Sequence, residues 1–92
     1  MNEKQLESKV VEYCKKHGLY CRKFSSPAHR GVPDRIIVGN GQVMFLELKS
    51  LGEKPTQLQL RELDLIRAAG ALALWTDSWE LAKLEITYAF NL

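Results

Sequence analysis

Three side chains with the chemistry of a hydrolytic site are brought together by a predicted β-hairpin. Asp34 follows Pro33 at the start of one apolar run, and Glu47 and Lys49 end the next run. Residues 39–41 between the runs are Gly-Asn-Gly, and an Asn-Gly pair between β-branched runs predicts a hairpin. Because the start of one hairpin strand lies beside the end of the other, we expect Asp34 next to Glu47, with Lys49 on the same face.

Two carboxylates a few ångströms apart repel one another unless one binds a proton or a cation lies between them. Oxygen ligands suit Mg²⁺ or Mn²⁺, which keep several waters and prefer carboxylates and phosphates. A metal-bound water is a nucleophile, and Lys49 could orient it or neutralise charge that develops on a phosphate. The three residues therefore predict a site for phosphodiester hydrolysis.

Hydrophobic periodicity predicts the elements that hold this site in place. The core order is α-β-β-β-α-β, and the second helix is a crossover that makes the last core strand parallel to its neighbour. We therefore expect an α/β fold in one domain, residues 1–92, with a mixed central sheet flanked by helices on both faces. The expected elements are a helix at 3–17, strands at 19–24, 35–38 and 42–48, a helix from the N-cap Thr56 to Gly70, a buried strand at 71–76, a short helix at 77–83 and an edge strand at 86–90.

Length and composition limit the class of protein. The chain has 92 residues, 46% of them hydrophobic and 26% charged, with a net charge of +2, as in an ordinary soluble globular protein. No apolar run approaches the ~20 residues that span a bilayer, and the first residues lack the apolar core of a signal peptide. Two cysteines cannot form a disulfide framework, so we expect a cytoplasmic protein. The mild charge permits nucleic-acid binding without arguing for it.

The hairpin residues also resemble a family signature. Pro33-Asp34, then twelve residues, then Glu47-Leu48-Lys49 is similar to the PD-(D/E)XK nuclease motif. Over residues 3–76 the chain resembles the small stand-alone VRR-NUC nuclease domains of phages. The resemblance is carried, in this order, by Glu7, residues 31–35 (Gly-Val-Pro-Asp-Arg), residues 47–49 (Glu-Leu-Lys), residues 54–59 (Lys-Pro-Thr-Gln-Leu-Gln) and residues 65–70 (Leu-Ile-Arg-Ala-Ala-Gly).

The resemblance implies a restriction-endonuclease-like fold, similar to that of Holliday-junction resolvases, and a set of site residues. The ligands it implies for Mg²⁺ or Mn²⁺ are the carboxylates of Glu7, Asp34 and Glu47 and the backbone carbonyl of Leu48. It makes Lys49 the catalytic lysine. The site glutamine of the family aligns best with Gln59, and Gln57 is the competing choice.

The same resemblance implies partners. It implies DNA as the substrate, branched or duplex, and a homodimer with two active sites. A phage-encoded protein would act in the cytoplasm of a bacterial host.

One predicted strand departs from the family pattern. The family takes its name from a Val-Arg-Arg motif, but this chain has Ala-Leu-Trp-Thr at residues 73–76. No arginine is present there to contact phosphate or support a dimer.

Each functional interpretation has a structural alternative. Asp34 could cap the backbone amides of a turn, and Glu47 with Lys49 could form a surface ion pair. Glu7 could be one of several exposed glutamates on an amphipathic helix. Gln59 stands three residues after the expected N-cap, so it could serve the capping box alone.

Two further sets of residues allow functional interpretations. A basic set flanks the site and could neutralise DNA phosphates or be ordinary surface charge; its members are Lys23, His29, Arg30, Arg35 and Lys54. Cys14, His17 and Cys21, with His29 further on, are zinc-ligand types, but their spacing matches no usual zinc motif. For the whole chain, the alternatives to a junction-selective nuclease are a non-catalytic DNA-binding module with the nuclease fold and a nuclease of the same superfamily without junction preference.

Overall fold

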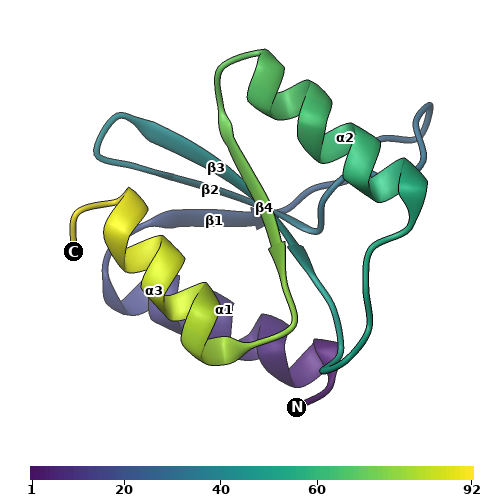
Figure 1. Ribbon diagram of the computed structural model, residues 1–92. Coiled ribbons are helices and arrows are strands. Elements are labelled where there is room, and N and C mark those ends of the chain that lie inside the picture. Colours follow the sequence, from purple (N-terminus) through teal and green to yellow (C-terminus); the bar gives the residue numbers. More distant parts are fainter.

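The computed structural model describes residues 1–92 and contains a four-stranded sheet with helices on both faces (Figure 1). The strand order is β1-β2-β3-β4, with antiparallel pairing from β1 to β3 and parallel pairing between β3 and β4. The mixed sheet and the crossover helix are thus confirmed. The elements are α1 (Glu3–Lys16), β1 (Tyr20–Lys23), β2 (Arg35–Gly39), β3 (Gln42–Leu48), α2 (Gln57–Ala68), β4 (Leu72–Thr76) and α3 (Trp79–Ala89).

The β2–β3 hairpin forms as predicted. Asn40 and Gly41 make its turn with φ values of 47° and 76°, and positive φ at both central residues is what a type I′ turn requires. The register pairs Arg35 of β2 with Leu46 of β3. Because directly opposite residues point to the same face of a sheet, this register decides which side chains meet at the open end of the hairpin.

One face of the sheet packs against α1 and α3, and the other packs against α2 over β3 and β4 (Figure 1). Alternate residues of β3 enter the core between the sheet and the helices α1 and α3, as the period of a strand requires. That core consists of Leu6, Val10, Cys14, Ile37, Met44, Leu46, Leu48, Ala82, Ile86 and Phe90. The intervening residues of β3, Glu47 among them, therefore point toward the α2 face.

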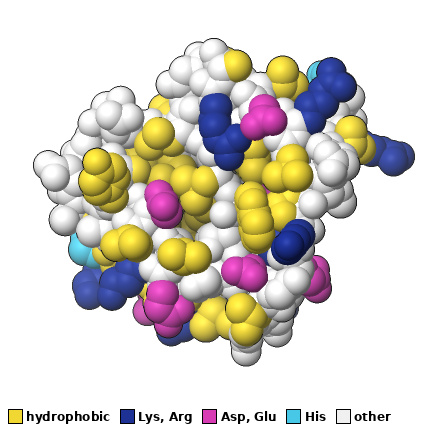
Figure 2. All heavy atoms as spheres, in the orientation of Figure 1, with side chains coloured by type: hydrophobic (Ala, Val, Ile, Leu, Met, Phe, Trp, Pro, Cys, Tyr) yellow, Lys and Arg dark blue, Asp and Glu magenta, His cyan; other side chains and the backbone are white.

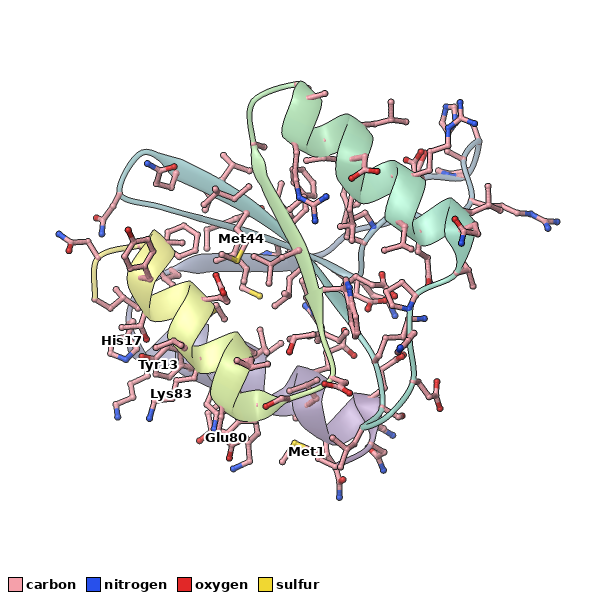
Figure 3. All side chains as sticks on the ribbon, viewed as in Figure 1. Met1, Tyr13, His17, Met44, Glu80 and Lys83 are labelled. Carbon is pink, nitrogen blue, oxygen red and sulfur yellow. The ribbon has the colours of Figure 1, made fainter.

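Aromatic and polar contacts join α1 to α3 (Figure 3). The hydroxyls of Tyr13 and Thr87 are hydrogen-bonded at 2.6 Å. The Tyr13 ring lies 4.4 Å from the ring of His17 and 5.6 Å from that of Trp79, and the Lys83 ammonium lies 5.8 Å from the Tyr13 ring. These contacts fix the two helices side by side beneath the sheet.

The C-terminal segment differs from the prediction. We expected a helix at 77–83 and an edge strand at 86–90, but Trp79–Ala89 is one continuous helix that Ser78 caps. The residues that anchor it are four positions apart and fully buried: Ala82, Ile86 and Phe90. This spacing places all three on one helical face, and that face belongs to the core shared with α1 and the sheet. The predicted edge strand is therefore wrong, and β4 ends the sheet.

The other elements lie where they were predicted; β3 has the expected range, β2 runs one residue further to Gly39, and the rest have shorter ends. α1 ends one residue before the expected His17, which is its C-cap, and α2 is capped by Ala69 in place of Gly70. No helix of the structure has the length and apolar character needed to cross a membrane.

Candidate active site

The open end of the β2–β3 hairpin brings two acids together. Since Arg35 pairs with Leu46, the next position outward places Asp34 opposite Glu47. The Asp34 carboxylate accepts a hydrogen bond at Oδ2 from the Leu48 backbone N–H, at 2.8 Å. This bond fixes the Asp34 side chain at the end of β3, beside Glu47, as the hairpin predicted.

Glu47 is a buried acid with one oxygen satisfied and one not. The residue is only 3% exposed. Its Oε2 accepts a hydrogen bond from Gln59 Nε2 at 3.1 Å and lies 3.4 Å from Lys49 Nζ. Its Oε1 is buried and has no hydrogen-bond partner. A buried carboxylate oxygen without a hydrogen-bond partner costs free energy. No group of the chain makes a hydrogen bond to Glu47 Oε1, so a bound cation or water would stabilise it.

Burial raises the pKa values of both acids. For Glu47, burial is the main cause and the Asp34 charge comes next; the pKa rises from 4.5 to about 7 in spite of the Lys49 charge. Burial also raises the pKa of Asp34, although the hydrogen bond from Leu48 acts in the opposite direction. A divalent cation beside the carboxylates would relieve both penalties. The pair therefore fits the oxygen-ligand chemistry of Mg²⁺ or Mn²⁺.

Glu7 of α1 reaches the edge of this pair and is held there by Arg35. Arg35 Nε donates to Glu7 Oε2 at 3.0 Å, with the side chains 17% and 29% exposed respectively. The Glu7 charge contributes to the raised pKa of Asp34, so the two carboxylates interact. The structure gathers no three His, Cys, Asp or Glu side chains into a metal-binding group. It brings Asp34 and Glu47 together, whereas the Glu7 carboxylate is paired with Arg35.

Comparison with known proteins assigns a family to this fold and site. No family profile matches the chain. A solved structure described as "VRR_NUC domain" has a TM-score of 0.84 and 27% identity, over 94% of this chain and 95% of that one. The chain is also 40% identical over 85 residues, 91% of each chain, to "Putative nuclease p44" of Acyrthosiphon pisum secondary endosymbiont phage 1. The chain belongs to the VRR-NUC nuclease family.

A further solved structure, described as "VRR_NUC domain protein", has the same fold. Its TM-score is 0.84 at 16% identity, and the match covers 100% of this chain and 90% of that one. The family resemblance and the restriction-endonuclease-like fold expected from the sequence are thus confirmed. The hairpin acids and Lys49 accordingly lie in a nuclease of VRR-NUC type.

Gln59 links this VRR-NUC site to the start of α2. Its Oε1 accepts a hydrogen bond from the Thr56 N–H at 2.9 Å, completing the predicted capping box, while its Nε2 donates to Glu47. The capping box is therefore formed, and the same side chain also contacts Glu47. Gln57, the competing choice, is an exposed residue of the first turn of α2.

We predict that Gln59→Glu lowers nuclease activity by about 10–100-fold, the usual effect of losing a group that orients a site carboxylate. The glutamate would keep the acceptor for Thr56 but put a second negative charge against Glu47 in place of a donor. Gln57→Glu, two residues away on the same helix turn, is the matched control and should leave activity unchanged. Equal activity of the Gln59→Glu variant and the native chain would reduce Gln59 to a capping residue.

Gly31 lets the connection from β1 to β2 pack closely against α2. Its φ is +84°, and a Cβ at this position would lie 2.9 Å from the carbonyl carbon of Leu58 and 3.1 Å from the backbone N of Gln59. The connection that leads into Asp34 therefore packs directly against the start of α2, which carries Gln59. A side chain at position 31 would push these two segments apart.

We predict that Gly31→Ala lowers the free energy of unfolding by at least about 1 kcal/mol more than Gly52→Ala. Gly52 has a similar φ of +89° with open space where a Cβ would stand, so its substitution measures the cost of positive φ alone, about 1–2 kcal/mol. Urea unfolding of both variants gives the comparison. Equal losses would show that the contact with α2 is not tight.

The predicted basic residues lie around the site on different elements. Lys23 ends β1 and lowers the pKa of Asp34, whereas Arg35 is largely enclosed in its pair with Glu7. Arg30 and Lys54 are exposed on the connections before β2 and after β3. Figure 2 shows Lys and Arg side chains projecting on the side where these connections pass the start of α2.

The zinc interpretation finds its residues in other roles. Cys14 belongs to the core, and the neighbouring Cys14 thiol and the Arg35 charge lower the pKa of Cys21. The His17 ring contacts the Tyr13 ring at a tilted angle at the end of α1. His29 is exposed on the connection between β1 and β2. Packing in the core and at the helix end explains Cys14, Cys21 and His17, and the structure does not gather the four residues into a metal-binding group.

Sequence reasoning missed two neighbours of the site. Trp75 of β4 is the register partner of Glu47 and contributes to its apolar surroundings. Ser50, directly after Lys49, accepts a hydrogen bond from the Glu3 backbone N–H at 3.0 Å. Neither contact has a local signal, since each joins segments that only the folded sheet brings together.

The raised pKa of Glu47 predicts that the metal-free protein becomes less stable as pH rises from about 4.5 to about 7. Between these values the folded chain binds more protons than the unfolded chain, so stability has a negative slope against pH. The loss is on the order of 2–3 kcal/mol. Denaturant unfolding with a chelator should show it, and Glu47→Gln should remove most of it. A flat profile for the native chain would contradict the burial argument.

Proposed function

We propose that this VRR-NUC protein is a metal-dependent DNA endonuclease that hydrolyses phosphodiester bonds with Mg²⁺ or Mn²⁺. The observation that carries the proposal is the buried, unpartnered Oε1 of Glu47 next to the Asp34 carboxylate. Two desolvated acids with an unsatisfied oxygen favour a hard divalent cation. In a nuclease, such a cation would neutralise negative charge on the scissile phosphate.

The proposed division of roles follows the positions of the side chains. Glu7, Asp34, Glu47 and the backbone carbonyl of Leu48 are the proposed metal ligands. When bound, the cation would lower the pKa of a water and neutralise charge on the phosphate. Lys49 Nζ, 13% exposed and 3.4 Å from Glu47, is free to hold the attacking water or a phosphate oxygen with its remaining N–H groups. Gln59 keeps Glu47 oriented.

In the proposed reaction the oxygen of the attacking water forms a bond to phosphorus while the bond to one ester oxygen breaks. The water loses a proton and the leaving ester oxygen gains one. The exposed basic residues Lys23, Arg30 and Lys54 would hold the flanking phosphates. Arg35 contributes from a more enclosed position beside Glu7.

We further propose that the protein acts as a homodimer with a preference for branched DNA, resembling Holliday-junction resolvases. A single chain with a Cα radius of gyration of 12.3 Å contacts only a short stretch of duplex, whereas two sites are needed to cut two strands. Apolar side chains exposed on β4 and α3 support self-association; they are Leu72, Leu81, Leu84 and Tyr88. The phage origin of the curated relative supports action in the cytoplasm of a bacterial host.

The test is a cleavage assay that compares supercoiled plasmid, linear duplex and a synthetic four-way junction. Each substrate is incubated with Mg²⁺, Mn²⁺ or a chelator, and Asp34→Asn controls for contaminating nucleases. We expect metal-dependent cutting that favours the junction. Equal cutting of linear duplex would favour a nuclease without junction preference. DNA binding without cutting in any metal would favour a non-catalytic binding module and overturn the proposal.

A further inference from the structure

The connection between β1 and β2, residues 25–33, is a closed loop whose two ends meet at Asp34. The Phe24 N–H donates to the Asp34 carbonyl at 2.8 Å. The Phe24 ring packs edge-on against the ring of Phe45 of β3, with the ring centroids 5.1 Å apart. Pro33, the last residue of the loop, is fully buried. The base of the loop is therefore fixed beside the hairpin acids.

A β-turn shapes the tip of this loop. The His29 N–H donates to the Ser26 carbonyl at 3.2 Å, and Pro27 follows Ser26 at the position where the fixed φ of proline favours a turn. The side chains of His29 and Arg30, at the end of the turn, are exposed. Because proline restricts the turn before a ligand binds, little conformational entropy is lost when the tip contacts a partner.

The loop is also packed against α2. A Cβ on Gly31 would lie 2.9 Å from the carbonyl carbon of Leu58, so Arg30, the residue before Gly31, stands next to the first turn of α2. Leu58 is 53% exposed, and Arg61, three residues further on the same side of the helix, is exposed as well. Figure 2 shows Lys, Arg and His side chains together where this connection passes the start of α2. Loop and helix thus form one surface, which consists of His29, Arg30, Leu58 and Arg61.

This surface has the composition of a contact with a nucleic-acid backbone. Its two arginines take part in none of the ion pairs of the chain, so their guanidinium groups are available to phosphate oxygens, which arginine binds in a bidentate manner. The exposed Leu58 side chain offers apolar surface to a deoxyribose. Lys54, exposed on the connection that leads into α2, extends the positive charge.

We infer that this surface docks the duplex arm of DNA next to the scissile phosphate and thereby determines which phosphate is cut. The inference rests on the proposed DNA nuclease function. Arginine contacts to backbone phosphates fix the register of a protein on a duplex. The loop that carries Arg30 ends at Asp34, and the helix that carries Arg61 also carries Gln59, which donates to Glu47. DNA bound here is therefore held in a set position relative to the hairpin acids, and the two arginines are positioning residues.

The first test measures binding of a short duplex in chelator, over a range of salt concentrations, by the native chain and by the Arg30→Ala/Arg61→Ala double variant. We expect about 10-fold weaker binding by the variant at about 0.1 M salt. The slope of log K against log salt should fall by about 2, one for each phosphate contact that is lost. Both side chains are exposed, and thermal unfolding checks that the variant is folded.

The matched control is Lys15→Ala/Lys16→Ala, which removes the same charge from exposed positions at the end of α1. The strand that follows begins at Tyr20, which pairs with Val38 near the hairpin turn. The control positions therefore lie at the opposite end of the hairpin from Asp34, and this variant should keep the native salt slope.

The second test maps cut positions on labelled DNA at saturating protein and Mg²⁺, where weaker affinity alone leaves the pattern unchanged. The arginine double variant should spread the cuts over neighbouring phosphates. Pro27→Gly keeps every charge but loosens the turn, so it should keep the native salt slope and still spread the cuts.

Native salt slope and native cut positions in the arginine double variant would overturn the inference. A lower slope with unchanged cut positions would make the surface a source of charge alone and would overturn its role in positioning. If the native chain cut no DNA in either metal, the proposed nuclease function would fail instead, and the salt slope would still test the docking surface.

Discussion

Replacing Lys49 with alanine is expected to lower the rate of DNA cleavage by about 10²–10³-fold, the usual cost of removing a preorganised group that stabilises developing charge. The ammonium lies 3.4 Å from Glu47 and is 13% exposed, so the variant loses a positive charge that is held in a largely enclosed position beside the acids. The rate is measured at saturating Mg²⁺ with a labelled duplex or junction. DNA affinity in chelator should change by only about twofold, because one phosphate contact among several is lost.

The control for this substitution is Lys9→Ala, which removes an exposed lysine from α1 and should leave the rate unchanged. Lys49→Ala also removes a charge that lowers the pKa of Glu47. The stability of the variant without metal should therefore continue to decline to a higher pH than that of the native chain. Cleavage at the native rate by Lys49→Ala would remove Lys49 from the catalytic group.

The part of the site that the sequence predicted is the part fixed by local structure. The Asn40-Gly41 turn sets the hairpin register, and the alternation of strand side chains then places Asp34 beside Glu47. Thr56 and Gln59 form the expected capping box because that motif is defined within four residues. Turn chemistry and strand period were sufficient for these contacts.

The remaining features depend on contacts between distant segments. Nothing near Arg35 in the sequence indicates its pair with Glu7, 28 residues away. The capping role of Gln59 could be predicted from the sequence. Its hydrogen bond to Glu47 could not, because this bond forms only when α2 packs on the sheet. The segment at 86–90 is short and apolar, so its pattern alone did not separate helix from strand. Packing of the buried residues Ile86 and Phe90 against α1 and the sheet decided it.

Replacing Asp34 with asparagine is expected to lower nuclease activity while raising the stability of the metal-free protein. The variant should lose cleavage by about 10³-fold and bind Mn²⁺ at least about 100-fold more weakly, because a charged ligand next to Glu47 becomes neutral. Without metal at pH 7.5, it should be more stable than the native chain by about 1 kcal/mol. The substitution removes a half-buried charge that repels Glu47 and raises its pKa.

Asparagine is the informative replacement because its amide oxygen can still accept the hydrogen bond from the Leu48 N–H, which Asp34 accepts at 2.8 Å. Asp34→Ala would leave that N–H without its partner and lower stability by about 1–3 kcal/mol, so it mixes the loss of a structural bond with the loss of a ligand. Thermal unfolding with chelator and with excess Mg²⁺ distinguishes the effects. Magnesium should stabilise the native chain and not Asp34→Asn, whereas equal stabilisation of both would mean that the cation binds elsewhere.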